Sequence, residues 1–188
     1  MKYNMADMYA LDLYLSNADK KDYKTAIQNI TVPSARHMSL LSWDLYMNSY
    51  NERLTNAIKR NEFGQILSYA EHFKWQNNLD LVFSENDYEA LIITDKNQKI
   101  IWVNDGFTSM TGYSKSYALS KTPRFLQGEQ TSIETKKRIK NKIAQDVPFE
   151  DVIINHRKDN TTYKCEIKVF PLFGENTTHY LALEKEIK

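Results

Sequence analysis

The chain has 188 residues, of which 41% are hydrophobic and 26% are charged, so it is long enough and apolar enough to bury a core. That balance excludes an intrinsically disordered protein, and the length excludes a large multi-domain enzyme. The chain has 25 Lys and Arg residues and 24 Asp and Glu residues, so its formal net charge is only +1. This overall charge does not favour binding to nucleic acid or to an anionic membrane.

The N-terminal part of the chain, residues 1–85, is predicted to be all-helical because its apolar residues recur at helical spacing. Pro33 and Ser34 are typical of a stop followed by the N-cap of a new helix. We expect this region to serve as a cap, a dimerisation segment or a partner-binding segment. The expected helices cover residues 9–15, a stretch from Ser34 to about Arg60, residues 63–73 and residues 79–83.

From residue 86 onward, short β-rich runs alternate with turn residues, which predicts a second domain over residues 86–188. Asn104 is placed to cap a helix that Gly112 ends, a second helix begins at Ser114, and a third covers residues 132–144. This order predicts an α+β fold with a five-stranded antiparallel sheet and helices on one face. The expected strands cover residues 90–94, 99–103, 149–157, 162–172 and 178–187.

Cysteine and histidine content excludes several kinds of site. The chain has one cysteine, Cys165, and 4 histidines, so an internal disulfide is impossible and a metal cluster is not expected. No nucleophile and base stand at a spacing that predicts a catalytic residue. Acidic residues interrupt the N-terminus before a signal peptide could form, and no stretch is long and apolar enough to span a membrane, so we expect a cytoplasmic protein.

Two short motifs follow the predicted hairpin, NDGF at residues 104–107 and TGYS at residues 111–114, and together they resemble the signature of the PAS domain family. The resemblance covers about Tyr88 to Ile187 and implies the PAS fold and a sensory function. Within that family, the run RFLQG at residues 124–128 is similar to the flavin-binding light-oxygen-voltage (LOV) branch.

In the LOV branch an asparagine and a photoreactive cysteine precede this arginine, whereas here those positions hold Thr122 and Pro123. Proline offers no nucleophile, so covalent flavin photochemistry is not expected. Cys165 falls on a predicted strand instead of the helix that carries the reactive thiol in that branch, and we expect it to be a small buried residue.

The resemblance also implies a candidate pocket. Arg124 and Gln127 match residues that hold the ribityl chain or phosphate, and Lys137 replaces a second phosphate-binding arginine. Asn155 matches the first asparagine that recognises the ring edge, whereas Cys165 replaces the second one and Glu184 replaces the glutamine of the last strand. Non-covalently bound flavin mononucleotide (FMN) is therefore one alternative, and a different small ligand or no ligand is the other.

Alternation along the strands sorts their side chains into two faces. The resemblance implies that Asn155, Cys165 and Glu184 fall on the side that faces the helices, where Glu184 is expected to be protonated, paired with Arg124 or Lys137, or exposed at a strand end. The opposite side is too apolar to face water, so a flanking helix or a second subunit is expected to cover it. This predicted interaction surface comprises Val152, Ile154, Leu181, Leu183 and Ile187.

The sequence therefore favours a non-enzymatic sensory or signalling module that acts through protein–protein interaction, either as a homodimer or with a separate partner protein. One alternative is a cysteine-less LOV-like sensor of blue light or redox state. The other is a DNA-binding regulator that uses the N-terminal helices. Nucleic-acid binding by the basic helix at residues 132–144 is not expected, because helical spacing spreads its Lys and Arg residues around a solvated face.

Overall fold

The computed structural model describes residues 38–188, so the helix expected over residues 9–15 lies outside the described part. The chain divides into two compact units, Met1–Thr55 and Asn56–Lys188. The second unit contains the whole sheet, helix α4 (Leu79–Glu85) and the C-terminal half of the long helix α3 (Met38–Phe73). It therefore joins residues from both of the predicted segments, 1–85 and 86–188.

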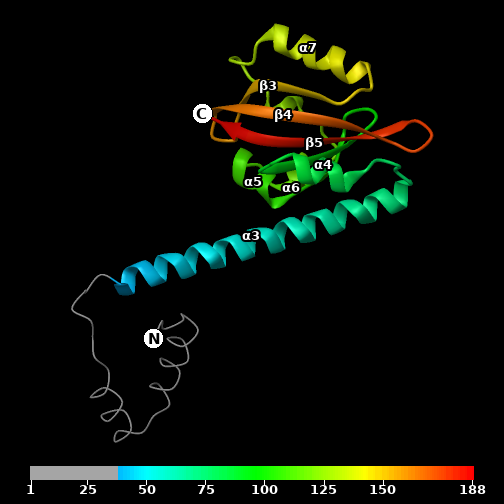
Figure 1. Cartoon of the computed structure of the whole chain (residues 1–188). Helices are drawn as coiled ribbons and strands as arrows, with labels where there is room; N and C mark the ends of the chain where they lie inside the picture. The colour runs from blue at the N-terminus through cyan, green and yellow to red at the C-terminus, as the bar shows by residue number, and fades with distance from the viewer. Residues whose placement is uncertain (1–37) are drawn as a thin grey trace, which may run out of the picture. The chain divides into compact units, whose positions relative to one another are not determined.

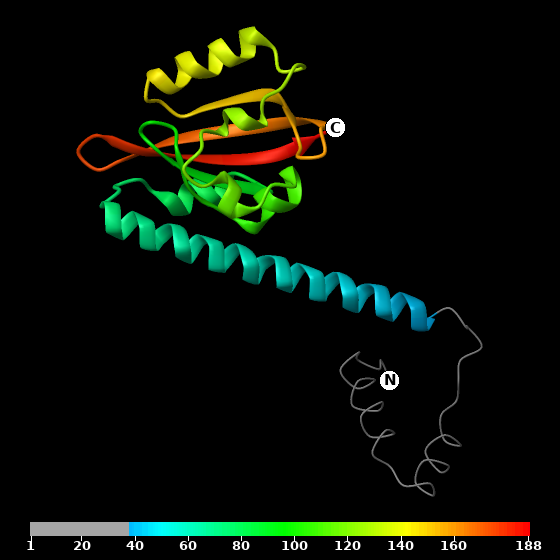
Figure 2. The ribbon, with the colours of Figure 1, turned by 180° about the vertical axis from the view of Figure 1, so that it is seen from behind.

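The predicted α+β fold is confirmed: a single antiparallel sheet of five strands has the order β2-β1-β5-β4-β3 (Figure 1). Helices α5 and α6 lie against β1 and β2, whereas α7 lies against β3, and Figure 2 shows the same arrangement from behind. The strands are β1 (Ala90–Asp95), β2 (Ile100–Val103), β3 (Phe149–His156), β4 (Thr162–Phe173) and β5 (Thr177–Ile187). The connecting helices are α5 (Asp105–Thr111), α6 (Lys115–Ala118), the 3-10 helix η1 (Pro123–Leu126) and α7 (Ile133–Ala144).

The inner face of the sheet carries one core, which packs against α5, α6, η1 and α7. Phe107 of α5 is completely buried there, as is Ala118 of α6. Side chains from β1, β3 and β4 complete this core, since alternate residues on each strand point to the same face. These residues are Ala90, Ile92, Ile153, Tyr163, Cys165 and Ile167.

The outer face of the sheet carries a second core, and the chain's own helices cover it. Ile66 of α3 and Leu79 of α4 are buried against this face. Leu181 and Leu183 lie in this core, with 0% and 2% of their surfaces exposed. The sequence left open whether a flanking helix or a second subunit covers these two leucines, and they pack against the flanking helices of their own chain.

The remaining members of the predicted interaction surface lie nearer the edge of the sheet. Val152 and Ile154 on β3 are each 38% exposed. Ile187, which pairs with Lys164 at the end of β5, is only partly buried. The covered and the exposed parts of this predicted surface are therefore distinct, and of its five residues the two on β3 present the most apolar surface to solvent.

Helix α3 runs without interruption from Met38 to Phe73, so the prediction of separate helices that meet near Arg60 was wrong. Charged Glu62 lies between the two predicted helices, on the side of α3 that carries Ile58 and Ile66. Glu62 is 7% exposed and accepts hydrogen bonds from Asn104 Nδ2 at 3.0 Å and from the Tyr88 hydroxyl group at 3.2 Å. A charged residue occupies a core position here because hydrogen-bond donors meet it there.

Asn104 connects this helix to the sheet and to the first inner helix. Its Oδ1 atom accepts from the backbone N–H groups of Leu91 and Phe107, both at 2.9 Å, so it caps α5 as predicted. Its Nδ2 atom donates to Glu62 and to the carbonyl oxygen of Glu89. One amide side chain thus joins α3, the start of β1 and the N-terminus of α5.

We expect Asn104→Ala to lower the free energy of unfolding by about 2–4 kcal/mol, because it removes an N-cap and leaves buried groups without partners. Urea unfolding followed by circular dichroism measures this loss. Asn141→Ala, on an exposed position of α7, is the matched control and should change stability by less than about 0.5 kcal/mol. Equal effects of the two substitutions would show that Asn104 does not hold these elements together.

We expect Leu181→Asp to release α3 from the outer face and to destabilise the fold by more than about 3 kcal/mol, since it buries a charge. The comparison variant is Lys168→Asp on β4, where the lysine donates to Asn86 Oδ1 at 3.2 Å and lies 3.5 Å from Glu150. Losing these partly exposed contacts should cost about 1 kcal/mol. Thermal unfolding and sedimentation of both variants test the difference, and similar unfolding temperatures would contradict the packing described.

Candidate functional site

A cavity of about 380 Å³ lies between the inner face of the sheet and a wall formed by η1 and α7. Apolar side chains form much of its surface, including Ile92, Leu126, Ile139, Ile153, Ile167 and Val169. Cavities of this size that are mostly apolar and contain a few polar groups are typical of small-molecule sites. The sheet and the connecting helices therefore enclose space for a ligand.

Five of the six residues predicted for the pocket line this cavity: Arg124, Gln127, Lys137, Asn155 and Glu184. The sixth, Cys165, belongs to the buried inner core and is not part of the cavity lining. Its Sγ atom lies 3.8 Å from Glu184 Oε2, so it lies behind the lining as a neighbour of that carboxyl group. The fold thus brings the candidate residues together, although four different elements supply those that line the cavity.

One side of the cavity is cationic. Arg124 comes from η1, and Lys136, Lys137 and Lys140 come from α7. Within the described part of the chain, none of these four side chains forms an ion pair or a hydrogen bond. Unpaired cations grouped beside an apolar cavity favour a ligand with an anionic group.

Sequence reasoning missed Lys136 and Lys140. It assigned the basic residues of α7 to a solvated face. Lys137 and Lys140 are exposed, but together with Lys136 they also line the cavity. Their spacing from Ile133, Ile139 and Ile143, which also line the cavity, was the available signal, because residues three or four apart share a side of a helix.

Glu184 is the one acidic residue among the described side chains that line this cavity. It is 5% exposed, and burial raises the pKa of its carboxyl group to about 7, while the Cys165 thiol acts in the opposite direction. Of the arrangements that the sequence left open, exposure at a strand end is excluded by this burial. Pairing with Arg124 or Lys137 is absent from the ion pairs of the described residues.

Cys165 is completely buried, and burial together with the nearby Glu184 raises the pKa of its thiol far above the ordinary value. A thiol of this kind stays protonated at neutral pH and is a poor nucleophile. Pro123, which stands first in η1, lines the cavity and carries no reactive group. The one cysteine of this chain therefore stands on β4 instead of η1, and it does not line the cavity.

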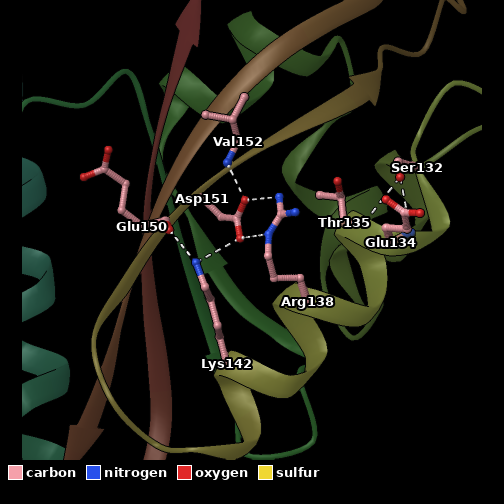
Figure 3. Close-up of polar contacts among 8 residues, drawn as sticks. All are labelled: Ser132, Glu134, Thr135, Arg138, Lys142, Glu150, Asp151 and Val152. Atoms are coloured by element: carbon pink, nitrogen blue, oxygen red, sulfur yellow. Dashed lines mark hydrogen bonds and ion pairs between the residues drawn. The ribbon is translucent and has the colours of Figure 1, made fainter.

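An ion-pair cluster fixes α7 above the sheet (Figure 3). Asp151 on β3 accepts two hydrogen bonds from Arg138, at 2.6 and 2.8 Å, and lies 3.0 Å from Lys142 Nζ. The Arg138 guanidinium group, followed in importance by Lys142 and the N–H of Val152, holds the pKa of Asp151 well below its usual range. Because the Asp151 side chain is only 5% exposed, this contact determines where the α7 wall of the cavity lies.

Comparison with known proteins matches residues 89–187 to the family model described as "PAS domain". The chain belongs to the PAS domain family. Among curated relatives, a blue-light photoreceptor of Listeria monocytogenes is 34% identical over 102 residues, which are 52% of this chain and 40% of that protein. A nitrogen fixation regulatory protein of Klebsiella oxytoca is 32% identical over 100 residues, 52% of this chain and 20% of that protein.

Solved LOV structures have the same fold. The light-state structure of the Aureochrome1 LOV domain is 29% identical with a TM-score of 0.52, over 54% of this chain and 83% of that one. The LOV domain of a blue-light-activated histidine kinase from Erythrobacter litoralis is 28% identical with a TM-score of 0.51, over 54% of this chain and 98% of that one. The predicted membership of the PAS family, with closest likeness to the LOV branch, is confirmed.

The PAS domain shared with these curated relatives is a sensory and signalling module, and it accounts for less than half of their length. In the described range 38–188, no helix is both long and apolar enough to cross a membrane. Within that same range, no three His, Cys, Asp or Glu residues cluster in a way that could hold a metal ion.

We expect Asp151→Asn to lower the free energy of unfolding at pH 7 by about 1–2 kcal/mol, discounted because Arg138 is half exposed. Since folding lowers the pKa of Asp151, its contribution is complete above the unfolded pKa, near 4, and is lost as the pH falls below that value. Chemical unfolding at pH 7 and pH 3 measures both effects. Glu129→Gln, in the exposed loop before α7, is the control, and an equal loss there would contradict the role of Asp151.

Proposed function

We propose that this PAS domain is a non-enzymatic sensor that binds a small ligand with an anionic group and signals through protein–protein contacts. The observation that carries the proposal is the cavity itself. An apolar interior, four unpaired cations on one side and an amide and a carboxyl group from β3 and β5 are the features of a site for an amphipathic polar ligand. The partner is a second copy of the chain or a separate signalling protein.

Strand β5 offers the route from the ligand to the surface. Glu184 lines the cavity, and the adjacent Leu183 lies in the core beneath α3 and α4. Because protein interiors are close-packed, a ligand that moves β5 changes the packing of the helices that cover its outer face. Helix α3 continues without a break to Met38, so this change reaches a segment outside the sheet.

The second candidate is a cysteine-less flavin sensor, favoured because Arg124, Gln127 and Asn155 all line the cavity. In that case the cations of η1 and α7 hold the phosphate, and Asn155 and Glu184 meet the ring edge. Bound flavin would supply light absorption and one-electron redox chemistry. Pro123 lines the cavity where the LOV branch carries its reactive thiol, so the bound state is non-covalent.

The first experiment is the visible absorbance spectrum of the purified protein in the dark and after blue light, followed by incubation with FMN and with riboflavin. The sensor proposal predicts that FMN binds more tightly than riboflavin. Replacing both Arg124 and Lys137 by Ala should weaken FMN binding by about tenfold while riboflavin binding changes little, because only FMN carries the phosphate. Lys164→Ala, an exposed position on the outer side of β4, is the control.

A structured flavin band in the purified protein would favour the flavin sensor. A flat spectrum, with no binding of either flavin, would reject it. Thermal unfolding with a panel of anionic aromatic and aliphatic compounds then tests the broader proposal. If no compound raises the unfolding temperature of the wild type by more than it raises that of the double variant, the cavity does not bind an anionic ligand.

A further inference from the structure

Glu184 lies at the sheet side of the cavity, and its carboxyl group has few hydrogen-bond partners. Its backbone pairs with Ala90 on β1 and with Ile167 on β4, so its side chain emerges among apolar neighbours. Among residues 38–188, the one hydrogen bond of its carboxyl group is with the Cys165 thiol, at 3.8 Å from Sγ to Oε2. A thiol is a weak donor, so most of the hydrogen-bonding capacity of this buried carboxyl group is unused.

No cation compensates for Glu184 in the described part of the chain. On β4 its titratable neighbours are Cys165 and Tyr163, and Glu89 before β1 adds a further negative charge near Cys165. The cations that face the same cavity, Arg124 on η1 and Lys136, Lys137 and Lys140 on α7, form no ion pair with it. A buried carboxylate without a cation is unfavourable, so the group is stable when it keeps its proton or when a ligand satisfies it.

We propose that Glu184 is the residue that determines ligand specificity in this cavity, by donating a hydrogen bond from its neutral carboxyl group to a carbonyl oxygen or imine nitrogen of a heterocyclic ligand. This inference rests on the proposed sensor function and names the chemistry that the inner end of the cavity selects. A glutamine at this position would donate at every pH, whereas Glu184 donates only while it is protonated. Ligand binding is therefore coupled to proton uptake.

The coupling falls in the physiological range. Burial raises the pKa of Glu184 to about 7, so the carboxyl group is mostly neutral at pH 6 and mostly ionised at pH 8. The ionised group has no proton to donate and repels a ligand acceptor atom. Affinity for an acceptor-bearing ligand should therefore fall by about tenfold between pH 6 and pH 8, as linkage requires when only the protonated form binds.

The test measures the affinity of the full chain for FMN and for riboflavin at pH 6 and pH 8, in the wild type and in Glu184→Gln. Riboflavin has the same ring without the phosphate, so a pH effect seen with both flavins excludes titration of the phosphate. We expect about a tenfold loss of affinity in the wild type and no loss in Glu184→Gln. Glu166→Gln, which faces the other side of the sheet on β4, is the matched control and should behave as the wild type.

A second readout needs no ligand. The infrared spectrum of the free protein at pH 6 should contain the carbonyl band of a protonated carboxyl group that is absent from Glu184→Gln and present in Glu166→Gln. The unfolding temperature of Glu184→Gln should exceed that of the wild type at pH 8 by more than it does at pH 5, because folding raises the pKa of Glu184 and ionisation opposes folding.

Several outcomes would overturn the proposal. Wild-type affinity for both flavins that is equal at pH 6 and pH 8 means that Glu184 does not gate binding, although the cavity is a ligand site. Absence of the protonated carboxyl band at pH 6 means that the group is ionised and selects a ligand donor instead. If neither flavin binds at either pH, the flavin candidate fails together with this ligand class, while stabilisation by another anionic compound would still support the broader sensor.

Discussion

Strand β5 is buried on both faces, and the two cores of this PAS domain depend on that constraint. Leu181 and Leu183 point toward α3 and α4, whereas Ala182 packs with the inner core and Glu184 lines the cavity. A movement of this strand toward or away from the cavity changes the packing beneath α3 and α4, because the outer core is close-packed. The ligand cavity and the outer helices therefore share one wall.

The polar contacts around Asn104 also hold α3 to the sheet, through hydrogen bonds instead of hydrophobic packing. Two side chains from opposite sides of the sheet edge meet there, Asn104 from the β2–α5 junction and Glu62 from α3. Every donor that reaches the Glu62 carboxyl group in the described residues is uncharged, namely the Asn104 amide and the Tyr88 hydroxyl group. Such a buried group is satisfied in one geometry only, so it fixes the position of α3 along the sheet, which hydrophobic packing alone does not.

Local patterns in the sequence predicted much of the fold. Alternation on the strands placed Asn155 and Glu184 on the inner face, and turn and cap residues such as Asn104 and Gly112 marked the ends of elements. The continuity of α3 was not predictable, since the partners that bury Glu62 are 26 and 42 residues away. The role of Asp151 was not predictable for the same reason. Its cationic partners, Arg138 and Lys142, belong to α7, and the sequence does not indicate how this helix packs on β3.

Charge is distributed unevenly in the cavity, and this bears on what it can bind. Four cations lie on η1 and α7, and one acidic side chain lies on the sheet, yet the two sets form no ion pair with each other. Asp151 holds Arg138 and Lys142 to β3, which fixes α7 and the lysines that it carries at the edge of the sheet. The separation thus favours a ligand that is polar at both ends, with an anionic group toward α7 and a hydrogen-bonding edge toward β5.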